Sequence, residues 1–458
     1  MKKLPIALFS VATIVTGWIA FAGWYGSKAY AVGRVPVVHL PFDSSSIDLQ
    51  IRNNERAVKQ DPKSALGLSL LSSAYLDRSR ESDDTVTAVN AEIAARRSLE
   101  IRKLGNIGAR NKLVQSLLQQ HRFKDALKEC QIAENIGVFS DDTTVLKAEC
   151  LIELGQYDDA KKLFARTPRA FKDGSAKSVV ARLLDIEGKP LEALAILRSI
   201  TAEVEMNGGM PSNAVAWFHT RLAMQLAKLG HHPESKAEYL RALKLYPRDY
   251  KAMAGLAKIA SQDGHWREVI EWGIQSDKIA QMADVRALVG DAYAMLGDPT
   301  NAEAQYAGVA SLVGRPSGMN DGLHEVTTGA GLHGHRLDRQ YAIFCADHDR
   351  DLAGAYAAAI RDFEARKDIY AYDTLAWVCY KKGDRDEAIK AIRIALGRGT
   401  RDPMLWFHAG EIFLNSGDRK HGINCLRKSL EIDPHFDGVA AGMAIRELNE
   451  RKPAGTQS

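Results

Sequence analysis

The sequence of 458 residues has few cysteines, few prolines and almost no net charge. Its five cysteines form no CxxC pair and no other metal-ligand spacing, which excludes a zinc module built on them. Only 14 prolines accompany 36 glycines, so the composition is not that of a fibrous or disordered chain. Lysine and arginine exceed aspartate and glutamate by 61 − 57 = 4, and no long basic run is present, which argues against a nucleic-acid partner.

The sequence also lacks the motifs of common enzymes. It contains no nucleophile elbow, no phosphate-binding loop and no kinase-like signature, so we expect a protein that is not an enzyme and needs no cofactor. Each cysteine falls in a segment with a helical apolar pattern, where a free thiol acts as a small buried hydrophobe. A disulfide between Cys130 and Cys150, on consecutive predicted helices, is conceivable in an oxidising compartment, and the sequence leaves this pairing open.

The N-terminus carries the longest uncharged stretch of the chain. This stretch runs from Leu4 to Ser27 and is long enough to span a bilayer as a helix. Lys2 and Lys3 precede it, and Trp24 and Tyr25 stand near its far edge. Because positive charge stays on the cytoplasmic side, this arrangement predicts that the rest of the chain lies in the extracytoplasmic (periplasmic) space.

A cleaved signal peptide is the competing interpretation of the same segment, since Ala29-Tyr30-Ala31 fits the small-x-small cleavage pattern. The length of the apolar run favours an uncleaved inner-membrane anchor, but both interpretations export the body of the protein. We therefore predict a signal-anchor helix or signal peptide over residues 1–31. A linker follows over residues 32–46, where Gly, Pro and Ser gather.

From residue 47 onward one local pattern recurs. A helical apolar pattern ends at a glycine, and a small residue follows five positions later inside a second helical pattern. The glycines are separated by 33, 42, 34, 33, 86 and 34 residues, and the steps of 33 and 34 match the tetratricopeptide period. The step of 42 fits one period plus an insertion at residues 206–211, and the step of 86 predicts a hidden repeat without the glycine together with an insertion. The seven positions are Gly155, Gly188, Gly230, Gly264, Gly297, Gly383 and Gly417.

The pattern has a steric explanation. Glycine supplies the left-handed backbone that ends the first helix, and the small residue lets the second helix approach closely. A proline such as Pro247 or Pro434 then ends the second helix. The sequence therefore predicts an all-α fold, a tetratricopeptide-like α-solenoid in which antiparallel helix pairs form a right-handed superhelix. Its concave side would be lined by the first helix of each pair.

Beyond the generic repeat, residues 337–437 resemble a large group of uncharacterised bacterial tetratricopeptide-repeat proteins. The upstream segments Ala216-Trp217, Tyr246-Pro247 and Ala254-Gly255-Leu256-Ala257 are similar to the same group. The resemblance implies the fold but assigns no functional residue. It is carried mainly by Arg339-Gln340, Ala346-Asp347-His348, Arg366-Lys367-Asp368, Tyr372-Asp373-Thr374-Leu375-Ala376-Trp377, Gly399-Thr400-Arg401-Asp402, His408-Ala409-Gly410 and Pro434-His435-Phe436.

Between the repeats lies a segment rich in glycine and histidine. We place repeats over residues 47–313 and 336–445, this insertion over 314–335 and a tail over 446–458. His324, His333 and His335 are weak candidates for Zn or Cu ligands, although a surface insertion is the favoured interpretation. The adjacent Asp347 and His348 point about 100° apart on a helix, so we interpret them as a helix end and turn rather than an active site.

An aromatic and charged set in the C-terminal repeats is the predicted binding site. Its members fall on the first helices, opposite the small packed residues, and Trp, Tyr and Arg dominate contact energies at interfaces. We therefore predict a non-catalytic scaffold that binds a protein or peptide in its concave groove outside the cytoplasm, with an envelope metal-binding protein as the alternative. The oligomeric state is left open. The groove set is Arg339, Tyr370, Asp373, Trp377, Tyr380, Lys381, Phe407, Glu411 and Asn415.

Overall fold

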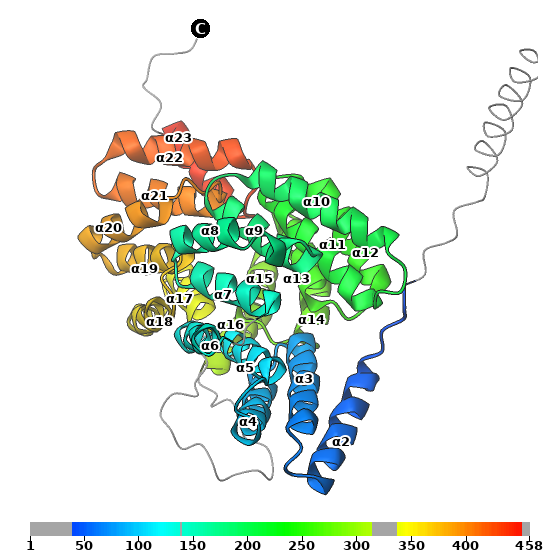
Figure 1. The fold of residues 1–458 in the computed structure, drawn as a ribbon. Helices are drawn as coiled ribbons and strands as arrows, with labels where there is room; N and C mark the ends of the chain where they lie inside the picture. The colour runs from blue at the N-terminus through cyan, green and yellow to red at the C-terminus, as the bar shows by residue number, and fades with distance from the viewer. Residues whose placement is uncertain (1–38, 138–139, 314–336, 451–458) are drawn as a thin grey trace, which may run out of the picture.

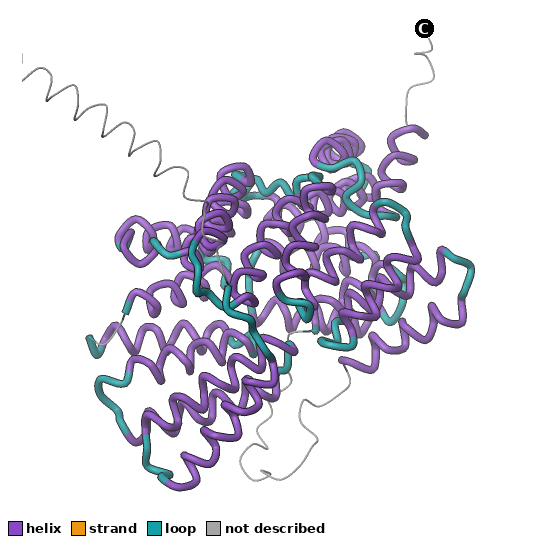
Figure 2. The backbone as a smooth tube through the Cα atoms, turned by 90° about the vertical axis from the view of Figure 1, so that its right-hand side faces the viewer, coloured by secondary structure: helices purple, strands orange, loops and turns teal. Residues whose placement is uncertain are grey.

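The computed structural model describes residues 39–137, 140–313 and 337–450 (Figure 1). Figure 2 shows this part of the chain as helices joined by short loops, with no strand among the described residues. The all-α solenoid predicted from the repeats is therefore confirmed. The helices pair as α3 (Ala65–Ser82) with α4 (Thr85–Ile101), α5 (Ile107–Gln119) with α6 (Phe123–Asn135), α7 (Asp141–Glu153) with α8 (Tyr157–Arg166), α9 (Gly174–Ile186) with α10 (Pro190–Met206), α11 (Ser212–Lys228) with α12 (His232–Leu245), α13 (Tyr250–Gln262) with α14 (Trp266–Asp277), α15 (Ala283–Met295) with α16 (Pro299–Val313), α17 (Asp338–Asp347) with α18 (Leu352–Ala365), α19 (Ile369–Lys382) with α20 (Arg385–Leu396) and α21 (Pro403–Asn415) with α22 (Arg419–Ile432).

Three further elements complete the described fold. α2 (Ser44–Gln60) precedes the first pair, α23 (Ala440–Glu450) follows the last, and the short 3-10 helix η1 (Pro168–Phe171) lies between α8 and α9. Each pair buries small residues between its helices, and successive pairs pack side by side. A stack of this kind is stable only as an array, because one pair cannot bury its own apolar face.

Glycine ends the first helix of seven pairs as the period predicted. The seven glycines have φ between 70° for Gly155 and 89° for Gly417, which is the left-handed region that side chains other than glycine rarely occupy. The small residue five positions later is buried in the second helix, as at Ala160, Ala193 and Ser235, each with 0% exposure. The predicted pattern of glycine and small residue is confirmed.

The remaining three pairs turn without glycine. Asp83, His121 and Asp349 have φ of 56°, 58° and 51° and take the place of the glycine between the paired helices. Asp349 lies between α17 and α18, which form the repeat that the sequence predicted within the 86-residue step. His348 ends α17, and its Nδ1 lies 2.8 Å from the carbonyl oxygen of Phe344. The Asp347-His348 segment is therefore a helix end and turn, as expected.

The loop predicted at residues 206–211 joins α10 to α11 and binds the N-terminal segment. The amide of Leu40 donates to the carbonyl of Met210 (3.0 Å), and the amide of Ser212 donates to the carbonyl of Leu40 (2.8 Å). The ring of Phe42 also packs edge-on against Tyr246, with centroids 5.6 Å apart. Residues 39–43, within the segment expected as a linker, are thus tied to the central repeats.

Two predicted segments lie outside the described residues. These are the signal or anchor segment over residues 1–31 and the insertion that carries His324, His333 and His335. Among the residues that the structure describes, none of the helices is long and apolar enough to span a bilayer. The anchor, the export that it implies and the metal alternative therefore stay predictions.

The solenoid closes on itself along a seam. The turns that end α7, α9 and α11 lie against the loops that follow α18, α20 and α22, so that each turn meets a loop from a later part of the chain (Figure 1). Contact is so close that a Cβ placed on Gly155 would lie 2.1 Å from the carbonyl oxygen of Lys367. A Cβ on Gly188 would lie equally close to the carbonyl oxygen of Gly399. Asp433 lies against Gly230 in the same way.

Candidate interaction surface

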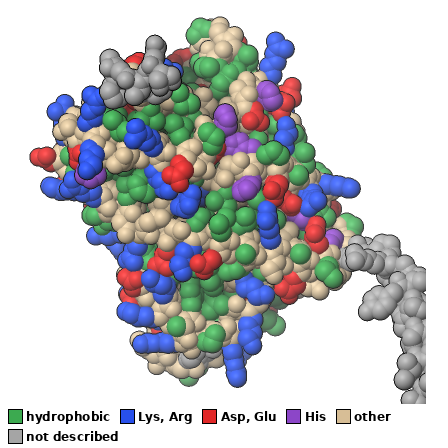
Figure 3. Space-filling model, turned by 90° about the horizontal axis from the view of Figure 1, so that it is seen from above, with side chains coloured by type: hydrophobic (Ala, Val, Ile, Leu, Met, Phe, Trp, Pro, Cys, Tyr) green, Lys and Arg blue, Asp and Glu red, His purple; other side chains and the backbone are tan. Residues whose placement is uncertain are grey.

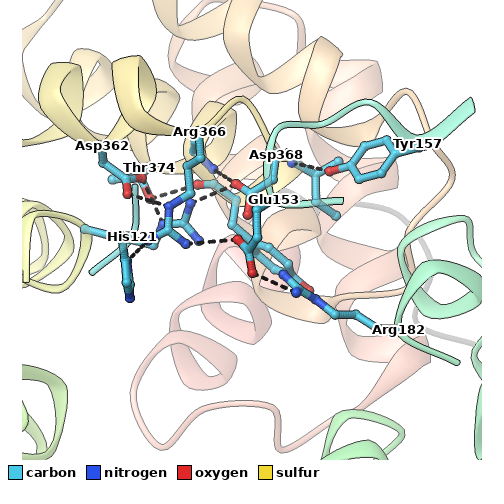
Figure 4. Close-up of polar contacts among 12 residues, drawn as sticks. His121, Glu153, Tyr157, Arg182, Asp362, Arg366, Asp368 and Thr374 are labelled. Atoms are coloured by element: carbon cyan, nitrogen blue, oxygen red, sulfur yellow. Dashed lines mark hydrogen bonds and ion pairs between the residues drawn. The ribbon is translucent and has the colours of Figure 1, made fainter. Parts of the chain in front are cut away.

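A network of charged side chains holds the seam together. Arg366, in the loop between α18 and α19, points between the N-terminal repeats (Figure 4). Its guanidinium lies 2.5 Å from Nδ1 of His121, 3.4 Å from Glu153 and 3.0 Å from Asp362. Glu153 is also 2.7 Å from Arg182 on α9. Burial would raise the pKa of Glu153, but the charges of Arg182 and Arg366 lower it to about 2.

A lysine on α11 makes the second set of contacts across the seam. Nζ of Lys228 lies 2.6 Å from Asp185, 3.2 Å from Asp402 and 2.7 Å from the hydroxyl of Tyr370. Burial would lower the pKa of Lys228, but Tyr370, Asp402 and Asp185 raise it well above its ordinary value. At the next turn His232 pairs with Asp433 at 3.0 Å.

These contacts define an occupied tier on the inner faces of the central repeats. Glu153, Asp185 and Lys228 lie in the last turns of α7, α9 and α11. The loop after α18 and the start of α19, residues 366–370, cover them together with Asp402. The hydroxyl of Tyr157 also accepts a hydrogen bond of 2.9 Å from the amide of Ile369. The protein's own chain therefore fills the groove at this level.

One to three turns earlier on α7 and α11 lies an open tier, made of Glu149, Trp217, Arg221 and Met224. Helical spacing places Glu149 on the face of Glu153, and Trp217, Arg221 and Met224 on the face of Lys228. Trp217 is 37% exposed and Met224 is 46% exposed, although both are large and apolar. The guanidinium of Arg221 lies 5.9 Å from the centroid of the Trp217 ring. An aromatic side chain and an arginine are thus presented together.

The charges of the open tier are not compensated as those of the occupied tier are. Nε of Arg221 is shielded from solvent and has no hydrogen-bond partner, which is also true of Nε of Arg366. Arg366 nevertheless has carboxylates within 4 Å, whereas Arg221 makes no ion pair within that distance among the described residues. Burial, followed by the nearby charge of Arg182, lowers the pKa of Arg221. Burial raises the pKa of Glu149, in spite of the attraction of Arg182. Charged groups that are desolvated without a partner are unfavourable and are typical of functional surfaces.

The structure brings part of the predicted groove set into the seam itself. Arg339 pairs with Asp362 at 3.0 Å and with Asp368 at 2.8 Å, and its guanidinium lies over the ring of Tyr370. The hydroxyl of Tyr370 accepts from Lys228. These two members of the set therefore contact the protein's own repeats.

Four other members are buried among the C-terminal helices. Trp377 stacks on His408 with centroids 4.2 Å apart, and its Nε1 donates to Asp347 at 2.7 Å. Asp373 lies 2.9 Å from Nδ1 of the same histidine. Phe407 is 2% exposed and Glu411 7%. The sequence did place these side chains on the first helices, but it did not indicate that neighbouring repeats would enclose them.

The last three members of the set lie nearer the surface. Asn415 is exposed and donates a hydrogen bond of 2.7 Å to the hydroxyl of Tyr380, which is half-buried. Lys381 pairs with Asp349 at 2.8 Å. These three side chains are the part of the predicted groove that a partner could reach without rearrangement.

Sequence reasoning missed the open tier. Trp217, Arg221 and Met224 are spaced i, i+4 and i+7 along a first helix, which is the signal that could have indicated it. These residues were not selected because the aromatic cluster in the C-terminal repeats is the stronger sequence signal. Whether that cluster was free depended on contacts with neighbouring repeats.

Other features of the described residues offer no better site. A cavity of about 220 Å³ is lined by α14, α15 and α16, and two of its three charged lining residues, Asp277 and Arg286, pair with each other at 2.8 Å; the third is Lys278. In the described part of the chain no cluster of three or more His, Cys, Asp or Glu side chains could hold a metal ion. All five cysteines are buried free thiols, as expected, and Cys130 and Cys150 are not joined by a disulfide.

The face of the molecule seen from above gives no alternative site by charge. On the face seen from above, basic and acidic side chains are interspersed rather than gathered into a patch of one sign (Figure 3). This distribution fits the formal net charge of +4. An electrostatic footprint for nucleic acid is not present on that face.

Comparison with known proteins identifies the repeats. Models of the tetratricopeptide repeat match residues 374–419 and 405–436. The chain therefore carries tetratricopeptide repeats, as its period predicted. The resemblance to an uncharacterised bacterial group is not tested by these matches. Among curated proteins, none matches the sequence.

Solved structures of two helical-repeat proteins also resemble the chain. The crystal structure of the APC/C hetero-tetramer Cut9-Hcn1 is 11% identical with a TM-score of 0.33, over 88% of this chain and 94% of that chain. The crystal structure of yeast Tom70 is 11% identical with a TM-score of 0.37, over 90% of this chain and 94% of that chain. At these TM-scores neither likeness carries an argument about fold or function.

Proposed function

We propose that this protein is a non-catalytic scaffold that binds a polypeptide partner on the inner face of its central repeats, at the open tier. The observation that carries the proposal is the contrast between two levels of the same helices. Where the chain's own loop reaches, Glu153 and Lys228 are fully paired, whereas Glu149 and Arg221, on the same faces, make no ion pair within 4 Å among the described residues. A second polypeptide would supply the missing contacts.

The composition of the open tier supports binding of a protein. Trp and Arg are the residue types that contribute most to interface energies, and Met adapts its shape to different partners. Tetratricopeptide arrays offer a concave surface for such recognition. We further propose, from the predicted signal or anchor over residues 1–31, that binding takes place outside the cytoplasm.

The proposal is tested by photo-crosslinking in cells. A crosslinking amino acid is placed at Met224 in the open tier, at Asn415 in the predicted C-terminal groove, or at Leu240 on α12 as a control. Leu240 is 45% exposed, nearly as much as Met224 at 46%, so accessibility is matched. The products are identified by mass spectrometry.

We expect a reproducible polypeptide product from position 224 that is absent from position 240. The same product from position 415 alone would move the site to the C-terminal repeats. Identical products from all three positions, or none from position 224, would refute binding at the open tier.

A further inference from the structure

The loop that fills the occupied tier shows how a polypeptide sits on these helices. Residues 366–370, at the end of that loop and the start of α19, contact α7, α8 and α11 and contribute both side-chain and backbone groups. Arg366 meets the carboxylate of Glu153, the amide of Ile369 donates to Tyr157, and the hydroxyl of Tyr370 accepts from Lys228. Each contact matches the charge or hydrogen-bonding role of the helix residue. The same complementarity predicts what the open tier requires.

The open tier has one charge that cannot be removed by proton transfer. A guanidinium stays protonated at any physiological pH, so Arg221 is relieved only by an anionic or hydrogen-bond-accepting partner. Glu149, in contrast, can take up a proton, and its pKa is already raised by burial. The unmet requirement of this surface is therefore for an anion.

The charges around Arg221 support this choice. The pKa of Arg221 is lowered first by its own burial and then by the charge of Arg182, and it is raised by the charges of Glu149 and Asp185. Arg182 is already paired with Glu153, and Asp185 with Lys228. Glu149 attracts Arg221 but forms no ion pair with it within 4 Å. A carboxylate beside Arg221 would satisfy Nε and would also reduce its repulsion by Arg182. Such a pair can form two parallel hydrogen bonds.

Apolar surface accompanies this charge. Trp217 precedes Arg221 by one helical turn, and Met224 follows it by about one turn, and both are exposed. The ring of Trp217 is held edge-on against Phe218, with centroids 4.8 Å apart, so its orientation is set before a partner arrives. A preorganised aromatic surface lowers the entropy lost on binding.

We infer that the open tier binds a polypeptide segment in which a carboxylate side chain stands next to apolar side chains. The carboxylate pairs with Arg221, and the apolar side chains pack on Trp217 and Met224. This inference rests on the proposed function and adds the chemical class of the partner.

Binding of designed peptides to the purified full-length chain tests the inference. The probe is a fluorescent octapeptide of alternating leucine and glutamate with blocked ends, and its binding is followed by fluorescence anisotropy. The comparison peptides replace glutamate with glutamine or with lysine. We expect the glutamate peptide to bind about 10-fold more tightly than the glutamine peptide, as a charge-assisted hydrogen bond would give, and the lysine peptide to bind least.

Variants of the protein assign this preference to one residue. Arg221→Gln should weaken the glutamate peptide about 10-fold and remove the preference over glutamine, whereas Arg221→Lys should keep part of it. Arg241→Gln, on the exposed surface of α12, is the matched control and should change nothing. Circular dichroism checks that each variant retains its helices.

The results separate this inference from the proposed function. Equal binding of the three peptides, preference for the lysine peptide, no binding of the glutamate peptide, or a preference that survives Arg221→Gln each overturns the acidic assignment. None of these outcomes affects a partner that is crosslinked through position 224. Absence of that crosslink would refute the proposed function, whatever the result of the peptide-binding experiment.

Discussion

Glu149 and Glu153 lie one turn apart on α7, yet their surroundings shift the pKa values of the two carboxyl groups in opposite directions. Glu153 is met by Arg182 and by Arg366 from the C-terminal repeats, and its pKa falls to about 2. Glu149 has no such partner, and burial raises its pKa. Arg221 and Lys228 differ in the same way on α11: the pKa of the arginine is lowered and that of the lysine is raised.

The difference teaches that the repeat alone does not decide whether its inner face is free. Both tiers have members on α7 and α11, and each combines a glutamate on α7 with a basic residue on α11. The occupied tier is filled because the superhelix brings loops from the C-terminal repeats onto it, at the seam. The open tier lies beyond the reach of those loops.

The largest expected effect comes from breaking the seam network. Arg366→Met would leave Glu153 with Arg182 alone and Asp362 with Arg339 alone. Loss of one charge from a buried network of this kind should lower the free energy of unfolding by about 3 kcal/mol. Arg221→Met is the matched change in the open tier and should not lower the free energy of unfolding, because Arg221 has no ion pair within 4 Å to lose among the described residues and its desolvated charge is unfavourable. Chemical denaturation of both variants measures the difference, and similar losses would contradict the distinction between the tiers.

The pH dependence of stability sharpens the comparison. Glu153 has a lower pKa in the folded protein than its ordinary 4.5, so the stability that its ionised form contributes is present above that value and is lost as the pH falls toward 2. Glu149 has a raised pKa, so its contribution is present at low pH and is lost as the pH rises through the folded-state pKa.

Two glutamine variants test these signs. Glu153→Gln should lower the free energy of unfolding by about 2–3 kcal/mol at neutral pH, with a smaller loss in acid. Glu149→Gln should raise stability at neutral pH and leave it unchanged in acid. Denaturation curves at several pH values give both results, and effects of the same sign at neutral pH would count against the account.

A smaller effect is expected from a methyl group placed in the seam. Gly188 and Gly417 both have positive φ, so alanine introduces similar backbone strain at either position. Only at Gly188 would the new Cβ meet a backbone carbonyl, that of Gly399 at 2.1 Å, whereas nothing lies within 4 Å of a Cβ at Gly417. Gly188→Ala should therefore be about 1–3 kcal/mol more destabilising than Gly417→Ala. Equal melting temperatures for the two variants would show that the seam is not closed in solution.

The repeats could be predicted because they depend on local chemistry. Glycine at positive φ and a small residue five positions later act within one helix pair, so Gly155 to Gly417 revealed the period. The helix pair formed by α17 and α18 was inferred only from the spacing of the repeats, because Asp349 replaces the glycine in its turn. The glycine pattern and the repeat spacing both depend on residues that are close to each other in the sequence.

The site could not be predicted to the same extent, because it depends on the pitch of the whole array. The phase of the first helices predicted that Tyr370 and Trp377 line the groove. It did not indicate that Lys228 would reach Tyr370, or that His408 would cover Trp377, since these contacts join different repeats. Trp217 and Met224 remained exposed for the same reason, because no distant loop arrives to cover them.

Thiol labelling tests the central claim most directly, because all five native cysteines are buried. Met224→Cys adds one reactive thiol in the open tier, and Leu240→Cys adds one on α12 with similar exposure. Both should react readily with a maleimide in the free protein, and the partner captured through position 224 should protect only the cysteine at 224. Protection at position 240, or continued labelling at position 224 in the complex, would contradict binding at the open tier.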